Sequence, residues 1–119
     1  MANVFYGYSK CSTCQKAKKW LTNNNIIFES KDIKEEQPTK EEIRSWKDKS
    51  NLSLLKFFNT SGVLYREMNL KEKVKIMTEE ELLECLSSDG MLIKRPVLVM
   101  EDGVLFGFKE EEWKKELMS

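Results

Sequence analysis

The spacing of apolar residues predicts a strand, a tight loop and a helix at the start of the chain. Residues 4–8 are mostly β-branched or aromatic, which is typical of a short strand. From about residue 13 to residue 23, apolar positions recur at helical spacing on one face, at Cys14, Ala17 and Leu21. We expect the run of three asparagines at 23–25 to end this helix, because asparagine tolerates the left-handed conformation of a C-terminal cap.

The same pattern predicts three further strands. Residues 26–33 begin with β-branched and aromatic side chains, and a strand–helix–strand unit with so short a crossover should be parallel and right-handed. Near the end, two apolar runs at 96–100 and 104–108 flank Asp102-Gly103, a strong hairpin signal. A last helix is expected over residues 109–117.

The middle of the chain shows no strand pattern and should be helical from about residue 39 to residue 88. Two segments, 39–42 and 78–81, have the Thr-x-x-Glu spacing of a capping box at a helix start. Together these elements predict an α/β fold with a thioredoxin-like βαβ…ββα mixed sheet and an α-helical insertion. We expect one domain, residues 1–119, with the thioredoxin-like core at about 1–35 and 91–119 and the insert at about 36–90.

Two cysteines, Cys11 and Cys14, lie where the first strand meets the first helix. A Cys-x-x-Cys in this place is typical of a thioredoxin-like redox motif. The free N–H groups and positive dipole end of a helix start favour a thiolate, which is the nucleophile of disulfide exchange. Four lysines and no acidic residue occur within residues 10–19, and cations stabilise a thiolate further.

The two thiols should differ in role. Cys11 falls in the loop or at the cap, so we predict it to be the attacking thiol. Cys14 shares a helix face with apolar residues, so we predict it to lean toward the core and to resolve the mixed disulfide. Structural thiols or half of a zinc site are the alternatives. The chain has no histidine and only Cys85 as a further cysteine, which disfavours a four-ligand zinc site; Cys85 itself we expect to fill the core.

Composition narrows the function classes. The chain has 20 basic and 20 acidic residues, and this balance argues against nucleic-acid binding through overall charge, although local basic patches remain open. The missing histidine removes the usual base of hydrolytic triads. We expect no direct nucleic-acid partner, no membrane span and no signal peptide, and therefore a cytoplasmic protein, as three cysteines in a reducing compartment would also suggest. We expect a monomer, with no metal and no bound cofactor.

Over nearly its whole length the chain resembles the arsenate reductase family, in the glutaredoxin-linked branch that includes the Spx-type transcriptional regulators. The resemblance lies in three segments: the tyrosine-rich strand followed by Lys10-Cys11-Ser12-Thr13-Cys14-Gln15-Lys16-Ala17, the Leu92–Val99 segment with its Arg95-Pro96 pair, and the Gly107–Trp113 segment. It implies a single arsenate-reductase-like domain in which Cys11 is catalytic, supported by Lys10, Ser12 and Thr13. It also implies a cis-proline at Pro96.

In the family's reductases, three arginines hold the arsenate oxyanion. The resemblance places one at Arg95, where the alternative is an ordinary surface arginine. The other two positions fall near Asn59, with Lys56 or Arg66 as substitutes, and near Phe108, which cannot bind an anion. We therefore expect weak oxyanion binding, because each such charge-assisted hydrogen bond contributes about 1.5–3 kcal/mol.

Three functional hypotheses follow. The first is a thiol–disulfide oxidoreductase that uses the cysteine pair and takes electrons from glutathione, glutaredoxin or thioredoxin. The second is a redox-sensing regulator that binds the RNA polymerase α subunit, with the pair as its switch. The third is a glutathione- and glutaredoxin-dependent arsenate reductase, which ranks behind the first because two of its three arginines lack a clear counterpart.

Overall fold

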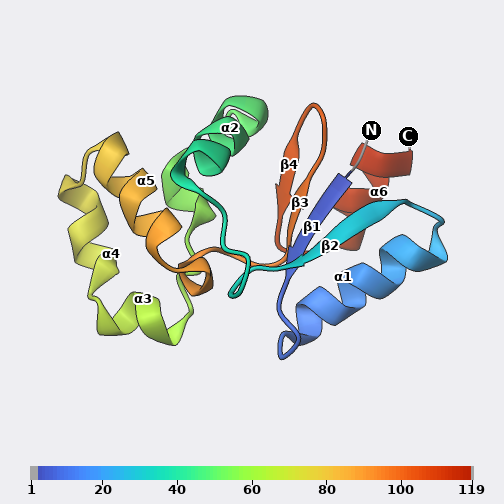
Figure 1. Ribbon diagram of the computed structural model, residues 1–119, viewed down its shortest axis with the longest axis horizontal. Coiled ribbons are helices and arrows are strands. Elements are labelled where there is room, and N and C mark those ends of the chain that lie inside the picture. Colours follow the sequence, from blue (N-terminus) through green and yellow to red (C-terminus); the bar gives the residue numbers. More distant parts are fainter. Residues whose placement is uncertain (1–2, 119) are drawn as a thin grey trace. The chain divides into compact units, whose positions relative to one another are not determined.

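A mixed β-sheet and a group of helices form the two parts of this protein (Figure 1). The computed structural model describes residues 3–118. The chain divides into two compact units: the first runs up to Asp32 and resumes at Arg95, and the second runs from Ile33 to Lys94.

The first unit contains a four-stranded sheet and two helices. Its elements are β1 (Asn3–Gly7), α1 (Ser12–Asn23), β2 (Phe28–Asp32), β3 (Val97–Val99), β4 (Val104–Phe106) and α6 (Glu110–Met118). The strand order is β2-β1-β3-β4, with β1 and β2 parallel and the other pairs antiparallel. This is the predicted thioredoxin-like mixed sheet, and the predicted parallel βαβ unit and C-terminal hairpin are both confirmed.

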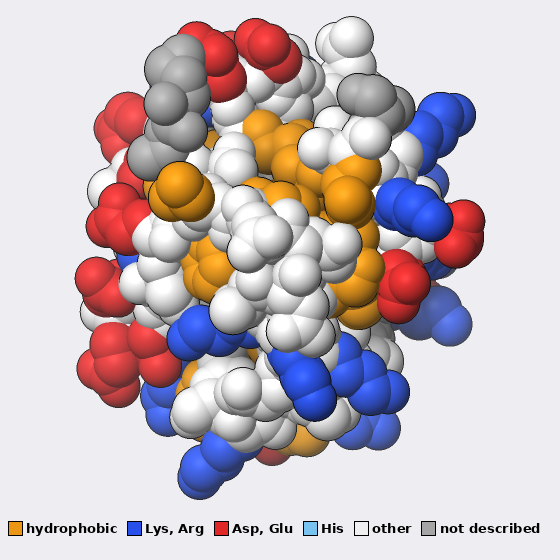
Figure 2. Space-filling view, turned by 90° about the vertical axis from the view of Figure 1, so that its right-hand side faces the viewer, with side chains coloured by type: hydrophobic (Ala, Val, Ile, Leu, Met, Phe, Trp, Pro, Cys, Tyr) orange, Lys and Arg blue, Asp and Glu red, His pale blue; other side chains and the backbone are white. Residues whose placement is uncertain are grey.

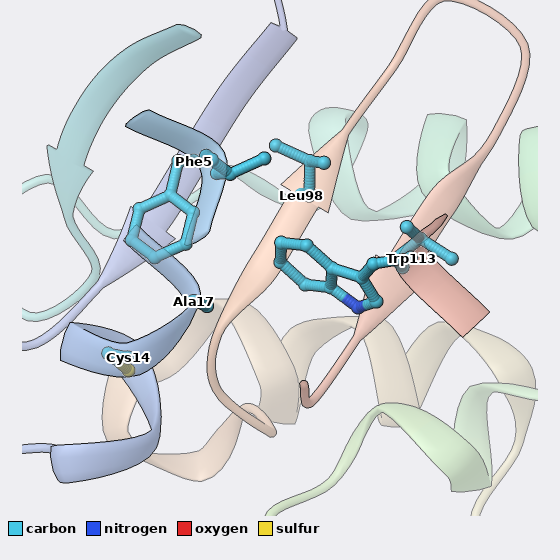
Figure 3. Packing of buried hydrophobic residues seen from close by; sticks show 7 residues of the cluster. Phe5, Cys14, Ala17, Leu98 and Trp113 are labelled. Carbon is cyan, nitrogen blue, oxygen red and sulfur yellow. The ribbon is translucent and has the colours of Figure 1, made fainter. Parts of the chain in front are cut away.

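One face of the sheet carries the core of this unit. Phe5 lies opposite Leu98, which lies opposite Leu105, so these side chains point to the same face. Residues of α1 and α6 pack against them, so both helices lie on this face (Figure 3). Trp113 of α6 is fully buried in this cluster, and its indole Nε1–H donates to the carbonyl oxygen of Gly107 at 3.0 Å.

The second unit is built from short helices, as predicted for the insert. They are α2 (Lys40–Ser50), η1 (Leu54–Phe57), α3 (Val63–Glu67), α4 (Leu70–Lys73), η2 (Val74–Ile76), α5 (Glu79–Ser88) and η3 (Gly90–Leu92). Both capping boxes are present: Thr39 begins α2 with Glu42, and Thr78 begins α5 with Glu81. Lys40 of α2 pairs with Glu80 and Glu84 of α5, at 2.7 and 2.8 Å, so these two helices are also joined by charge.

Two local predictions need correction. The second strand begins at Phe28 rather than residue 26, because Asn25 takes a left-handed conformation with φ of 58° and Ile27 is 85% exposed. On α5, the residue fully buried between Leu82 and Leu86 is Leu83, whereas Cys85 is only half-buried. The buried face of α5 is therefore formed by Leu82, Leu83 and Leu86, and Cys85 lies at its edge.

Candidate active site

The cysteine pair is positioned by the junction of β1 and α1. Cys11 is the N-cap of α1, with φ of −102° and ψ of 111°, and its N–H donates to the carbonyl oxygen of Tyr8 at 3.0 Å. Its sulfur accepts a hydrogen bond from the backbone N–H of Cys14 at 3.2 Å, as a capping side chain does. No acidic residue lies in the first turn of the helix. Cys11 is therefore held at the positive end of the helix dipole.

The two thiols lie close together and differ in exposure. The Cys14 Sγ lies 2.7 Å from the Cys11 Sγ and donates its S–H to it, and both cysteines are free thiols in this structure. Cys14 is 1% exposed and packs with Phe5 and Ala17, whereas Cys11 is half-buried (Figure 3). The prediction that Cys14 leans toward the core is confirmed. Of the two cysteines, Cys11 is the more accessible residue.

Burial raises the pKa of the Cys14 thiol from the ordinary value of 9.0 to about 12. Desolvation is the largest cause, and the hydrogen bond to Cys11 adds to it. A backbone hydrogen bond with Tyr8 and the positive charge of Arg95 lower the same pKa by smaller amounts. Cys14 therefore keeps its proton at neutral pH and can donate it to the Cys11 sulfur.

Arg95 lies at the same end of the sheet. Its guanidinium carbon is 5.5 Å from the centre of the Tyr8 ring, a cation–π contact, and its charge reaches the Cys14 thiol. The Arg95–Pro96 peptide bond is cis, as the resemblance implied, and Pro96 is buried just before β3. The structure thus places Arg95 near the cysteine pair, while its role toward an anion stays a prediction.

The supporting residues predicted from the sequence are neighbours of the cysteine pair along the chain. Lys10, Ser12 and Thr13 are all exposed. The lysines of α1 are exposed as well, and Figure 2 shows basic side chains gathered on the lower part of the face where α1 runs. The helix that begins at the cysteine pair therefore presents several positive charges to solvent.

The two other positions expected for anion binding belong to different units. Phe108 packs edge-on against Trp113 with ring centres 5.0 Å apart, and its ring centre lies 6.0 Å from that of Trp20. This residue is partly buried and packs against the core of the first unit. Asn59 belongs to the second unit, where it lines a surface hollow with Lys56 and Lys94.

Three contributors to the site were missed from the sequence. Tyr8 was noted only as part of a strand, yet its backbone bonds to Cys11 and its ring lies against Arg95. Gln15 ties the loop to the helix by donating its side-chain amide to the Ser9 carbonyl at 3.2 Å. A Cβ on Gly7 would lie 3.4 Å from the Cys14 Cβ, so this glycine permits a close approach to the thiol. A glycine directly before the loop was the one available signal.

Comparison with known proteins settles the family. The family model described as the ArsC family matches residues 6–116. The chain belongs to the ArsC family. This confirms the resemblance to the arsenate reductase family, whose relatives here include named transcriptional regulators.

Three similar proteins illustrate the range of the family. The uncharacterized protein YusI of Bacillus subtilis is 51% identical, over 97% of this chain and 98% of its own length. The regulatory protein MgsR of the same species is 30% identical, over 92% of this chain and 85% of its own. The crystal structure of a possible arsenate reductase from Streptococcus mutans is 43% identical, with a TM-score of 0.86, over 94% of this chain and 97% of that one. The proteins similar to this chain thus include both a regulatory protein and a protein described as a possible arsenate reductase.

Residues 3–118 lack two further features. No three His, Cys, Asp or Glu side chains in this part of the chain are grouped so as to hold a metal ion. Across the same residues, no helix has the length and apolar character needed to cross a membrane.

Proposed function

We propose that this ArsC-family protein is a thiol–disulfide oxidoreductase in which Cys11 attacks and Cys14 resolves. The observation that supports this most is the pair itself: two free thiols with sulfurs 2.7 Å apart, one buried and one accessible. Structural thiols would not need an exposed sulfur at a helix start. Here Cys11 accepts both the N–H and the S–H of Cys14.

The reaction proceeds in two exchanges. The Cys11 thiolate attacks one sulfur of a substrate disulfide, a new S–S bond forms to Cys11, and the first substrate thiolate leaves. Cys14 then gives up its proton and attacks the Cys11 sulfur, forming the Cys11–Cys14 disulfide and releasing the second substrate thiol. The substrate disulfide is reduced by two electrons and the cysteine pair is oxidised by two.

The proton of Cys14 has to leave during the second exchange. The chain contains no histidine to take it, so the departing substrate thiolate is the natural acceptor. The oxidised pair is returned to two thiols by an external reductant, for which glutathione, glutaredoxin and thioredoxin are the proposed donors. Arg95 would stabilise negative charge on the sulfurs, as guanidinium groups do for anions.

A redox titration tests the proposal. The protein, with Cys85→Ser so that only the pair remains, is equilibrated in glutathione buffers, and its thiols are alkylated and counted by mass. We expect an internal disulfide with a potential near −200 to −300 mV, the range of working thioredoxin-like couples and cytosolic glutathione. Cys11→Ser should abolish exchange, and Cys14→Ser should stop at a mixed disulfide with glutathione.

Two outcomes would contradict this assignment. Turnover of any disulfide by the Cys11→Ser variant would remove Cys11 as the attacking thiol. Glutathionylation of Cys11 with no internal disulfide in the parent protein would show that Cys14 does not resolve, and would favour a reductase that relies on an external thiol.

A second function is favoured by one finding, the 30% identity to the regulatory protein MgsR over most of both chains. In this alternative, the pair is a switch that controls binding to the RNA polymerase α subunit. A pull-down with the purified α subunit distinguishes the two: binding in only one redox state of the pair favours the regulator, and binding in neither state excludes it.

Arsenate reduction is the third proposal. It is favoured by the likeness to the Streptococcus mutans protein and opposed by the packing of Phe108 against the core. A coupled assay with glutathione, glutaredoxin and arsenate measures it directly, and we expect its rate to be far below that with disulfides.

A further inference from the structure

A cleft of about 200 Å³ opens beside the buried thiol in the first unit. It lies at the carboxyl ends of the parallel strands β1 and β2, next to the first turns of α1. Cys14 forms part of its wall, together with Gly7, Lys18 and Asp32. The carboxyl ends of strands in open α/β sheets are a frequent place for ligands.

Gly7 lines the cleft and has no side chain to project toward it. Gly7 pairs with Asp32 across the two parallel strands, so it lies between Asp32 and the helix that carries Cys14. A Cβ on Gly7 would lie 3.4 Å from the Cys14 Cβ and only 2.7 Å from the Phe5 ring. A larger residue would therefore fill the space next to the thiol.

Three charged residues line the cleft: Lys18, Lys31 and Asp32. Lys18 lies one helical turn after Cys14, on the same face of α1, and it forms no ion pair among residues 3–118. Asp32 is the last residue of β2, and its side chain lies on the same face of the sheet as those of Ser30 and Phe5. Lys31 also borders the cleft, but its ammonium lies 5.8 Å from the centre of the Tyr6 ring, on the other face of the sheet.

We propose that this cleft binds the α-amino-acid head group of a small disulfide substrate, with Lys18 against its carboxylate and Asp32 against its ammonium. The proposal rests on the proposed function and names a substrate class for it: disulfides of cysteine and of compounds that carry a free amino-acid end. The hydroxyl and amide groups of Ser30 and Gln15, which also line the cleft, suit such a polar ligand.

The reach between the cleft and the sulfurs supports this assignment. In cystine, the carbon that bears the amino and carboxylate groups is two bonds from the sulfur. Cys14 forms part of the cleft wall, and its sulfur lies 2.7 Å from the Cys11 sulfur, although Cys11 itself does not line the cleft. We therefore expect a head group bound in the cleft to hold its disulfide on the side of the cysteine pair. Binding energy from the head group then orients the disulfide for attack.

Three disulfides of nearly equal length test the proposal. Cystine carries both groups, cystamine lacks the carboxylates, and 3,3′-dithiodipropionate lacks the ammonium groups. The rate constant for exchange with the reduced protein is measured for each by acid quenching and alkylation. Each rate constant is divided by the rate constant of the same disulfide with free dithiothreitol, which corrects for its intrinsic reactivity. After this correction, we expect cystine to react at least about fivefold faster than either truncated compound.

Matched variants assign the effect to the cleft. Lys18→Gln should slow cystine about fivefold relative to cystamine, while Lys19→Gln, the neighbouring exposed lysine outside the cleft, should not change this ratio. Asp32→Asn should slow cystine relative to dithiodipropionate, with Glu29→Gln on the opposite face of β2 as its control. A shift of the Gly7 amide resonance on adding S-methylcysteine, which cannot exchange, gives an independent measure of binding.

The outcomes separate this proposal from the proposed function. One outcome is that the relative rate constants of the three disulfides are the same with the protein as with free dithiothreitol, and that Lys18→Gln and Lys19→Gln leave the cystine-to-cystamine ratio equally unchanged. The cleft proposal is then wrong, while the proposed oxidoreductase function remains. If none of the three forms an internal disulfide, the proposed function itself fails. A shift of the Gly7 resonance would then still support the cleft as a binding site.

Discussion

At the scale of single residues, the two cysteines differ because only one of them is withdrawn from water. Cys14 packs among apolar side chains and holds its proton, whereas Cys11 caps a helix and accepts two hydrogen bonds from residue 14. This division suits the two steps of disulfide exchange. In the proposed reaction, the Cys11 sulfur would meet the substrate, and Cys14 would act only after a mixed disulfide has formed beside it.

The pKa of Cys14 makes the stability of the reduced protein depend on pH. Below pH 9 both the folded and the unfolded chain keep this proton, and between pH 9 and about 12 the unfolded chain loses it first. The free energy of unfolding should therefore fall as the pH rises above 9. Chemical denaturation at pH 8 and pH 10.5 should show a loss from this group of about 2 kcal/mol.

Other groups titrate in the same range, so the comparison needs a variant that lacks only this thiol. Cys14→Ser should show a decline smaller by that amount, because serine does not ionise there. Cys85 is present in both proteins, and its own pKa, raised by burial, cancels in the comparison. Identical declines in the two proteins would show that Cys14 has an ordinary pKa.

At the scale of elements, the starts of the helices are determined by short-range hydrogen bonds. The helix α1 uses the Cys11 sulfur as its cap, while α2 and α5 use threonines in capping boxes. A cysteine at a capping position accepts the hydrogen bond with sulfur, which is a weaker acceptor than the side-chain oxygen of serine, threonine or aspartate. We interpret the weaker cap as a small loss of helix stability that places a thiol where the proposed redox chemistry needs it.

The two threonine caps give a prediction about stability. Thr39→Ala and Thr78→Ala should each lower the free energy of unfolding by about 1 kcal/mol, because each removes the acceptor for a backbone N–H at the helix start. Thr60→Ala, in an exposed turn, is the matched control and should change it by less than about 0.5 kcal/mol. Urea denaturation measures all three. Equal effects at the three threonines would contradict the capping role.

At the scale of the whole molecule, charge is balanced overall and uneven locally. The formal net charge is zero, yet α1 has lysines and no acidic residue, and α6 begins with three glutamates. The exposed large apolar side chains include Ile27, Val63 and Ile76, which belong to separate segments. Singly scattered apolar residues of this kind are ordinary on a protein surface and give no reason for a stable oligomer.

We therefore predict a monomer in solution. Light scattering at pH 8, away from the isoelectric point near 6.4, should give a mass of 14.0 kDa in both redox states of the pair. Self-association should increase as the pH approaches 6.4, because net repulsion between molecules is then smallest. A mass of twice the chain at pH 8 would contradict the prediction.

The sequence by itself determined the order of the elements and the place of the cysteine pair. Helix caps, the Asp102-Gly103 turn and the spacing of Cys11 and Cys14 all depend on residues a few positions apart, so the local pattern contains them. The same locality explains why strand and helix ends were predicted only approximately. The left-handed Asn25 shortened β2, and burial by neighbouring elements selected Leu83 over Cys85.

Only the tertiary structure decided what surrounds the pair. The packing that raises the pKa of Cys14, the contact between Arg95 and Tyr8, and the burial of the Phe108 ring against Trp113 all join residues far apart in the sequence. The cleft likewise depends on the register that sets Gly7 opposite Asp32. Such contacts follow from strand pairing and from the way helices cover a sheet, and no local pattern specifies them.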